Sequence, residues 1–442
     1  MITIEPFLTA YDPSEVPGSS IDPLGFDRGY TTLADAILPG LTNVASRPRY
    51  FAMLCAALQL ADSAPPTGTP RDRLRHRREL VLRAERLWTL ACTLASRGDD
   101  SGRMPTDGLR GIRALDRLVA RLSASGEKTV SANFRLLSRQ DAMGMLGIFG
   151  TVADNLGLIA RSELSLGSDL GHRLATTFLN DTRPATGVRR AIVEGGIARV
   201  DELRDWGQRA HVNAVVSRAE HAILKEAIDA DDVRSRMAAW ALRVPGTEGE
   251  SELLRFQRML ASGPGDPDLV EALRIIGAFE QCFRLTSLAF QRLLWLCQSR
   301  SPARVDVDEL ANDPTLIAVA AALPAAVLAL TAALDAVTTS SVRARVSRLT
   351  DTYTFLIIAA RAPSSVGLVE CLLQRHTHVQ GTRRQGGRAK MPWLELRDGR
   401  LSQTLTWATR VTREPNSIEH VAAHPYRMAA LDRIVFGGEG ES

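Results

Sequence analysis

Apolar residues spaced three and four positions apart run through most of this 442-residue chain, clearly at 109–123 and at 269–296. Because an α-helix completes a turn about every 3.6 residues, this spacing gathers apolar side chains on one helical face. Alternating patterns typical of strands are scarce, and the clearest lies at 392–411, where Arg397-Asp398-Gly399 predicts a hairpin turn. The sequence therefore predicts a mainly α, multi-helical protein with a small C-terminal β-hairpin.

Clusters of Gly, Pro and polar residues interrupt the helical patterns and suggest four consecutive segments. We expect an N-terminal helical region at 1–108, a compact module at 109–182, a helical core domain at 183–362, and a basic loop with the hairpin at 363–442. No interruption exceeds an ordinary loop in length, and no repeat of fixed period is evident.

The charge balance limits the class of partner. The chain has 54 basic and 50 acidic residues, a net charge of +4, which excludes a histone-like polycation and requires any polyanion site to be local. Only three of the basic residues are lysines (Lys128, Lys225 and Lys390). We attribute the excess of arginine first to codon usage and second to its bidentate binding of phosphate.

Five widely spaced cysteines without a CxxC pair predict buried thiols in a reducing, cytoplasmic setting. The N-terminus has neither the basic nor the apolar region of a signal peptide. The chain contains no GxxxxGK[ST], HExxH or GxSxG motif and no GxGxxG after a strand, which excludes a motor role. We expect no cofactor and no bound metal, and a non-catalytic protein rather than an enzyme.

One apolar run has the length of a membrane span. The 21 residues at 314–334 are uncharged, but nine of them are Ala and Pro324 interrupts the middle. Aromatic belts and a basic flank are also missing. We therefore expect a core helix and no membrane partner.

A motif at residues 20–60 surrounds the sequence LPGLTNVASRPRYF, where Pro39-Gly40 ends one helix and Arg47-Pro48 opens the next. This segment resembles uncharacterised bacterial proteins encoded beside helicases and nucleases in phage-defence islands. The residues that carry the resemblance are Pro39, Gly40, Thr42, Arg47, Arg49 and Tyr50. The resemblance implies a subunit of an antiviral defence complex. Two interpretations of the arginines stand open: a phosphate clamp at the helix start, or pairing with Asp35 or Asp27 while Tyr50 packs.

The module at 109–182 ends like bacterial winged helix-turn-helix domains, in which a strand enters the wing and returns into a helix. The matching residues are Leu156, Gly157, Leu158, Ile159, Leu164, Leu166, Gly171, Leu174, Ala175 and Phe178. Such a module would place 141–155 as the recognition helix, Arg135, Arg139 and Gln140 at its approach, and Arg161 on the wing. Because 141–155 has three glycines and no Lys or Arg, a module that docks a protein is the alternative to one that binds DNA.

Two stretches concentrate positive charge. Residues 71–86 contain seven arginines on a predicted helix, either a binding face or a solvated one. The other stretch has no acidic residue between Cys371 and Leu394. We interpret it as a flexible cationic loop that contacts a nucleic-acid backbone, with Trp393 as a side chain that stacks on a base. The alternative is a disordered hairpin connection. Its basic residues are Arg375, His376, His378, Arg383, Arg384, Arg388 and Lys390.

Three hypotheses of function follow. The preferred one is a non-catalytic DNA-binding subunit or adaptor that contacts nucleic-acid backbone and an operon-encoded helicase or nuclease. The second is a metal-dependent nuclease built from Glu395, His376 and Lys390, with a weaker acid and imidazole cluster at Glu414, His420 and His424. The third is a protein-interaction scaffold without affinity for nucleic acid.

Overall fold

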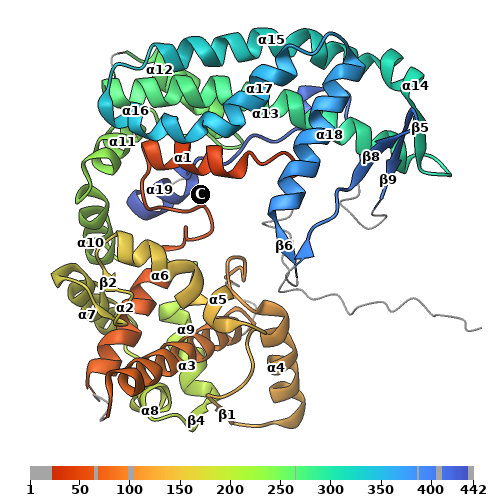
Figure 1. The fold of residues 1–442 in the computed structure, drawn as a ribbon. Helices are drawn as coiled ribbons and strands as arrows, with labels where there is room; N and C mark the ends of the chain where they lie inside the picture. The colour runs from red at the N-terminus through yellow and green to blue at the C-terminus, as the bar shows by residue number, and fades with distance from the viewer. Residues whose placement is uncertain are drawn as a thin grey trace, which may run out of the picture. The chain divides into compact units, whose positions relative to one another are not determined.

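A computed structural model describes residues 22–63, 68–97, 104–263, 265–385, 388–404 and 411–436. The protein is 66% helix and 6% strand, which confirms the predicted mainly α, multi-helical fold (Figure 1). The strands are short, and they pair into one three-stranded sheet and three two-stranded ones within the described residues.

The chain divides into two compact units, each made of stretches distant in sequence. Unit 1 combines residues 1–37 with 240–426, and unit 2 combines residues 38–239 with 427–442. These two discontinuous units differ from the four consecutive segments that the turn residues suggested. Turn residues mark where a helix ends, and they carry no information about which distant helices share a core.

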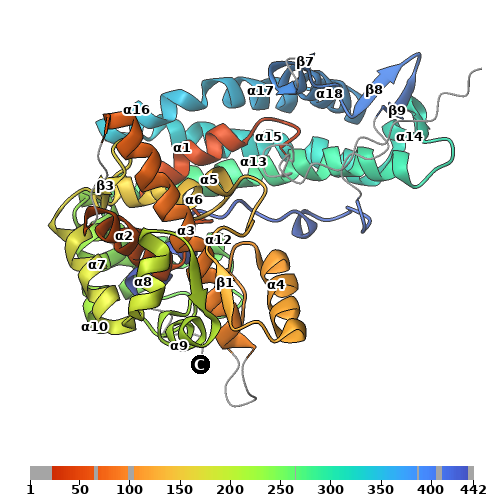
Figure 2. The same cartoon turned by 90° about the horizontal axis from the view of Figure 1, so that it is seen from below.

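Unit 1 is built around two long helices that run side by side in both views, α13 (Pro267–Gln298) and α15 (Pro314–Asp335) (Figures 1 and 2). Asp266 caps the first and Asp313 caps the second, each followed by a proline at the first helical position, an arrangement that favours helix initiation. The other helices are α1 (Asp27–Ile37), α12 (Glu252–Ala261), α14 (Val307–Asn312), α16 (Ser340–Val346), α17 (Thr350–Ala360) and α18 (Ser365–Thr382), with short 3₁₀ turns η2 (Ser347–Leu349) and η3 (Ile418–His420).

Helix α15 contains the apolar run at 314–334. It packs against α13, α17 and α18 with one face, which buries Leu316, Val319, Leu323, Val327 and Leu330. Ile317 and Leu328 on its other face are 48% and 70% exposed. Among the described residues, α15 is the one helix long and apolar enough to cross a membrane, with a third of its most apolar window buried. Burial of one face agrees with a core helix, and the absence of a membrane partner stays a prediction.

The predicted C-terminal hairpin is present. Strands β8 (Leu394–Arg397) and β9 (Arg400–Gln403) are antiparallel, with Arg397 opposite Arg400, so the loop is Asp398-Gly399. Both loop residues have positive φ, 49° and 71°, as a two-residue turn of this kind requires. Strand β5 (Arg304–Asp306) extends the sheet beside β9, and β6 (Arg384–Gln385) pairs with β7 (Arg388–Ala389).

Unit 2 is organised around α2 (Pro48–Ser63) and α3 (Pro70–Ser96). A capping box between Thr69 and Asp72 and a proline at its first position start α3. The other elements are α4 (Ile112–Ser125), β1 (Thr129–Ser131), α5 (Gln140–Met143), α6 (Met145–Asn155), β2 (Ile159–Ala160), β3 (Ser165–Leu166), α7 (Asp169–Thr182), α8 (Thr186–Val193), β4 (Ile197–Arg199), α9 (Val200–Ala210), α10 (Arg218–Asp229) and α19 (Met428–Val435). Helix α11 (Asp232–Arg243) carries the chain from unit 2 into unit 1.

The segment expected to be a winged helix has some of the predicted features. A short hairpin, β2–β3, follows α6 and leads into α7, as the resemblance implied. Strand β1, however, pairs with β4, which lies outside 109–182. The helix expected over 141–155 is also interrupted at Gly144, where α5 ends and α6 begins. A Cβ atom at Gly144 would lie 2.5 Å from the buried Glu85 carboxylate, so this position requires glycine.

The close crossing of α9 over α3 in unit 2 depends on a glycine. A Cβ atom at Gly207 of α9 would lie 1.9 Å from the carbonyl oxygen of Ala91 in α3. We therefore expect Gly207→Ala to lower the free energy of unfolding by at least about 3 kcal/mol, since neither backbone can yield without losing contacts. Urea unfolding followed by circular dichroism measures this.

The matched control is Gly277→Ala in α13, where a new Cβ would meet no atom within 4 Å. That variant should gain up to about 1 kcal/mol from better helix propensity. Equal stability of the two variants would contradict the close crossing.

Candidate anion-binding pocket in unit 2

A pocket of about 420 Å³ lies in unit 2 between α3 and the segment 133–141. Its lining consists of Arg78, Leu82, Arg86, Asn133, Phe134, Arg135, Leu137, Ser138, Gln140 and Asp141. The pocket brings part of the arginine-rich stretch 71–86 together with Arg135, which the sequence analysis assigned to a different module. Leucines and Phe134 supply its apolar wall.

Three arginines line this pocket together with one carboxylate, Asp141, and a second carboxylate, Glu79, pairs with Arg86 without being part of the lining. Arg78 pairs with Asp141, and Arg86 donates from Nε to the Gln140 side-chain oxygen at 2.8 Å and lies 3.5 Å from Glu79. Arg135 is exposed, and among the described residues its side chain has neither an ion-pair nor a hydrogen-bond partner. The excess of positive charge suits an anionic ligand.

The side-chain amide of Gln140 holds the wall of the pocket together and is not free to bind a ligand. It is buried, and its Nε2 donates to the Leu82 carbonyl at 2.9 Å and to Glu85 Oε2 at 2.7 Å. Glu85 in turn accepts from the backbone N–H of Met145 at 2.6 Å, at the start of α6. The predicted contact of Gln140 with nucleic acid is thus replaced by a structural role.

The other predicted contacts in this region lie outside the pocket. Arg139 is exposed at the start of α5. Arg161 is exposed next to the β2–β3 hairpin, where its Nη1 donates to the Thr151 hydroxyl at 2.6 Å. A role for either in binding nucleic acid stays a prediction.

The N-terminal motif separates into three roles. Arg49 is buried and its Nη1 lies 2.7 Å from Glu220 Oε1, which is wholly buried, so the phosphate-clamp interpretation is wrong for Arg49. Tyr50 is also buried and stacks on Phe149 with ring centroids 4.2 Å apart. Arg47 binds Asp107 at 2.5 Å and lines a second, smaller pocket. The partner of Arg49 is neither Asp35 nor Asp27, because helix packing brings α10 against this part of unit 2.

The cationic loop expected at 375–390 is mostly ordered secondary structure. Helix α18 continues to Thr382, and Arg375 is buried, with Nε donating to the Leu24 carbonyl at 2.9 Å and Nη2 to Asp351 at 2.7 Å. Arg383 lies 3.6 Å from Asp22. Within this stretch Arg388 is exposed and Lys390 is partly exposed, and the side chain of Arg384 lies outside the described residues.

Trp393 is buried, contrary to its expected role as a stacking side chain for bases. Its ring lies 5.3 Å from that of His376 and 6.2 Å from that of Phe290, and it is only 9% exposed. A base cannot reach a ring that already packs in the core of unit 1.

His376 cannot serve as the predicted nuclease residue. Its Nδ1 lies 2.9 Å from the Pro23 carbonyl, and its Nε2 accepts the Trp393 backbone N–H at 2.8 Å, so Nδ1 holds the proton and both nitrogens are engaged. Burial lowers the pKa of His376 to about 4. Glu395 pairs with Arg397 at 3.0 Å. Within the described ranges, no group of three or more His, Cys, Asp or Glu is arranged to hold a metal ion.

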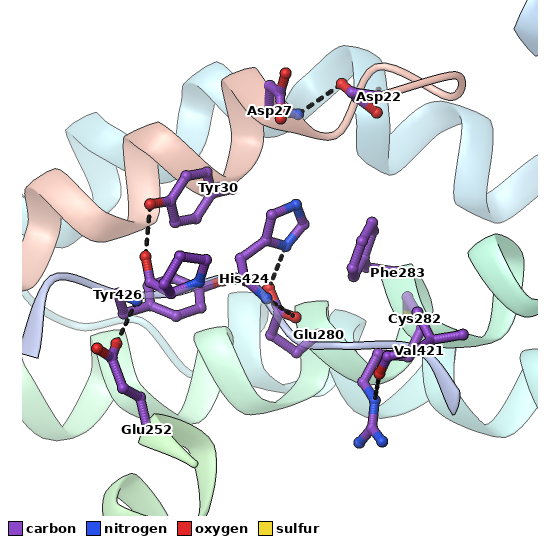
Figure 3. Close-up of polar contacts among 12 residues, drawn as sticks. Asp22, Asp27, Tyr30, Glu252, Glu280, Cys282, Phe283, Val421, His424 and Tyr426 are labelled. Atoms are coloured by element: carbon purple, nitrogen blue, oxygen red, sulfur yellow. Dashed lines mark hydrogen bonds and ion pairs between the residues drawn. The ribbon is translucent and has the colours of Figure 1, made fainter. Parts of the chain in front are cut away.

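A buried carboxylate that the sequence did not reveal as a site, Glu280, holds the last residues of unit 1 against α13. Glu280 on α13 accepts from His424 Nδ1 at 2.7 Å and from the Tyr426 hydroxyl at 2.7 Å (Figure 3). The His424 ring lies between Tyr30 and Phe283, whose centroids are 4.7 and 3.9 Å away. Glu414 instead binds Arg292 at 2.5 Å. An acid between Phe279 and Phe283 on an apolar helical face was the available signal for Glu280.

In comparisons with known proteins, no protein-family model, no curated protein and no solved structure matches the chain.

Glu85 makes the stability of the protein depend on pH. Burial raises the pKa of Glu85 to about 7, against the opposing hydrogen bonds from Gln140 and Met145. Between about pH 4.5 and pH 7 the unfolded chain releases this proton first, so stability should fall as pH rises, by roughly 3 kcal/mol at most. Urea midpoints measured from pH 5 to 8 should decline less steeply in Glu85→Gln than in the wild type. If the urea midpoints of Glu85→Gln and of the wild type decline equally with pH, titratable groups other than Glu85 cause the decline.

The Arg49–Glu220 pair should be structural. Arg49→Met leaves a buried carboxylate unpaired, and we expect a loss of about 3–5 kcal/mol in unfolding free energy. The double variant Arg49→Met, Glu220→Leu should recover most of that loss, because it removes both charges. The control, Lys225→Met, breaks the exposed Lys225–Asp229 pair and should change stability by less than about 1 kcal/mol. A double variant as unstable as Arg49→Met would refute this account.

Proposed function

We propose that the protein is a non-catalytic, DNA-associated subunit or adaptor, and that unit 2 contacts nucleic-acid backbone at the pocket formed by Arg78, Arg86 and Arg135. The observation that supports this proposal is that three arginines from two distant stretches line one pocket, and that Arg135 among them has no carboxylate partner within the described residues. Arginine forks bind phosphate oxygens bidentately, and phosphate contacts supply most of the affinity of non-specific binding.

Besides its arginines, the pocket has an aromatic side chain, Phe134, that could contact the bases of a nucleic acid. Phe134 is partly exposed in the lining, and Asn133 and Ser138 add neutral hydrogen-bonding groups. An aromatic ring beside guanidinium groups is typical of surfaces that bind single strands, where bases stack while phosphates are neutralised. We therefore favour single-stranded or end-frayed nucleic acid as the ligand.

The cellular setting is also part of the proposal. The resemblance of the LPGLTNVASRPRYF segment to proteins of phage-defence islands supports a cytoplasmic antiviral complex with an operon-encoded helicase or nuclease. In that setting a subunit without catalytic motifs would help its partner engage DNA.

A protein-interaction scaffold is the second candidate. The observation that favours it is the set of large apolar side chains on the surface, among them Val215, Ile197 and Leu328 at 90%, 67% and 70% exposure. This candidate requires stable co-purification with an operon neighbour and no affinity for nucleic acid.

The test compares charge-removing variants in a binding assay. We expect Arg78→Gln, Arg135→Gln to weaken binding of a labelled single strand at least about tenfold at 50 mM salt and to reduce the slope of log K against log salt by about 1.4, or 0.7 for each lost phosphate contact. Fluorescence anisotropy over a salt titration measures both quantities.

The control double variant is Arg274→Gln, Arg361→Gln, which removes two exposed arginines of unit 1. It should bind like the wild type. If the wild type fails to bind at 50 mM salt, or if both double variants lose affinity equally, the proposed interface is wrong and the scaffold becomes the better explanation.

A further inference from the structure

A second pocket in unit 2, of about 260 Å³, is lined by three more arginines. Arg47 precedes α2, Arg110 precedes α4 and Arg433 belongs to α19, so the three come from widely separated parts of the chain. Neither Arg110 nor Arg433 belongs to a sequence motif that predicts a site. We propose that this pocket binds a phosphate monoester or inorganic phosphate as a dianion.

The positive charges of the three arginines are only partly neutralised by carboxylates of the protein. Arg47 binds Asp107 at 2.5 Å and Asn213 at 2.7 Å, whereas Arg433 donates to the neutral Ser46 hydroxyl at 3.2 Å. The Arg110 side chain has no hydrogen-bond or ion-pair partner among the residues described. Three guanidinium groups therefore converge beside one carboxylate, which leaves charge for a dianion.

One buried carboxylate, Glu85, interacts with the charge of Arg110 but forms its hydrogen bonds with other groups. Glu85 is close enough for the Arg110 charge to lower its pKa, but its oxygens accept from Gln140 at 2.7 Å and from the Met145 backbone at 2.6 Å. Arg110 thus remains available to a ligand in the pocket.

The backbone of the pocket is held by buried groups. The Tyr50 hydroxyl donates to the Gly108 carbonyl at 3.3 Å and accepts from the Arg110 N–H at 2.9 Å, so a core residue fixes the 108–110 segment. Gly108 has a φ of +81°, and a Cβ there would lie 2.8 Å from Arg47 Nε. The Arg47 side chain therefore passes across a position that requires glycine. This pre-organisation lowers the cost of binding.

The size of the pocket limits the ligand. A volume of 260 Å³ lies below the ~300–1,000 Å³ typical of pockets for drug-sized ligands. Val44, Leu109 and Phe149 form an apolar side next to the arginines. This arrangement fits a phosphate group with a few attached atoms, either free phosphate or the 5′-terminal phosphate of a strand. A phosphodiester, with a single charge, suits three guanidinium groups less well.

The experiment uses the full-length protein and three probes: inorganic phosphate, a 5′-phosphorylated tetranucleotide and the same tetranucleotide with a 5′-hydroxyl. Calorimetry at constant ionic strength should show binding of phosphate or of the phosphorylated strand. Arg110→Gln should weaken it at least about tenfold. Stronger binding of the phosphorylated strand than of free phosphate identifies a strand end as the source, and the reverse identifies the free anion.

A pH series separates specific recognition of the dianion from general attraction. A phosphate monoester loses its second proton near pH 6 and inorganic phosphate about one pH unit higher, whereas sulfate is a dianion throughout. The ratio of inorganic phosphate to sulfate affinity should therefore rise between about pH 6 and 8. Titration of protein groups affects both anions and cancels in the ratio.

Three comparisons decide the outcome. The Arg121→Gln control, on the exposed side of α4, should bind like the wild type. Arg135→Gln in the first pocket should also leave phosphate binding unchanged, so failure of this proposal is distinct from failure of the proposed nucleic-acid surface. Absence of binding by the wild type, or equal binding by Arg110→Gln, would overturn the proposal. Arg110→Gln is the deciding variant because Arg433→Gln also removes the hydrogen bond to Ser46.

Discussion

A buried aromatic cluster is the contact on which unit 2 depends. Tyr50 of α2 stacks on Phe149 of α6 and meets Trp88 of α3 edge to face at 4.7 Å. The Trp88 indole donates to the Ala210 carbonyl at the end of α9 at 2.7 Å. The cluster thus joins four helices, and because the Tyr50 hydroxyl also holds the 108–110 segment, the same residues that form the core position the second pocket. Aromatic pairs of this geometry add to the free energy gained from burial alone.

Many arginines of this chain form hydrogen bonds that stabilise the fold and are not available to a ligand. Arg83 donates to the carbonyls of Ile192 and Val193, where α8 ends, and Arg255 donates to the carbonyls of Ala241 and Val244, where α11 ends. Helix C-termini leave unpaired carbonyl groups with partial negative charge, which guanidinium groups satisfy well. A count of arginines therefore says little about binding, and the informative ones are those without a structural partner, such as Arg135 and Arg110.

Buried contacts between residues far apart in the sequence account for the sequence predictions that were wrong. His376 and Trp393 sit in a stretch without acids, which favoured a loop open to nucleic acid, yet the two side chains pack together in the core. The partners that explain them, Pro23 and Phe290, lie far away in sequence. Similarly, Arg49 was a candidate ligand for phosphate, and its carboxylate partner is 171 positions distant. Composition within a short window cannot show contacts of this kind.

Short sequence patterns were enough to predict the local structure. Apolar spacing predicted the helices, Pro39-Gly40 marked the break between α1 and α2, and Asp398-Gly399 specified the hairpin turn, because each depends on backbone geometry within a few residues. Which charged side chains meet depends instead on the packing of distant helices. Arg78 and Arg135 share one pocket, and Arg110 and Arg433 share another, because helices distant in sequence bury their apolar faces against each other and carry these side chains along.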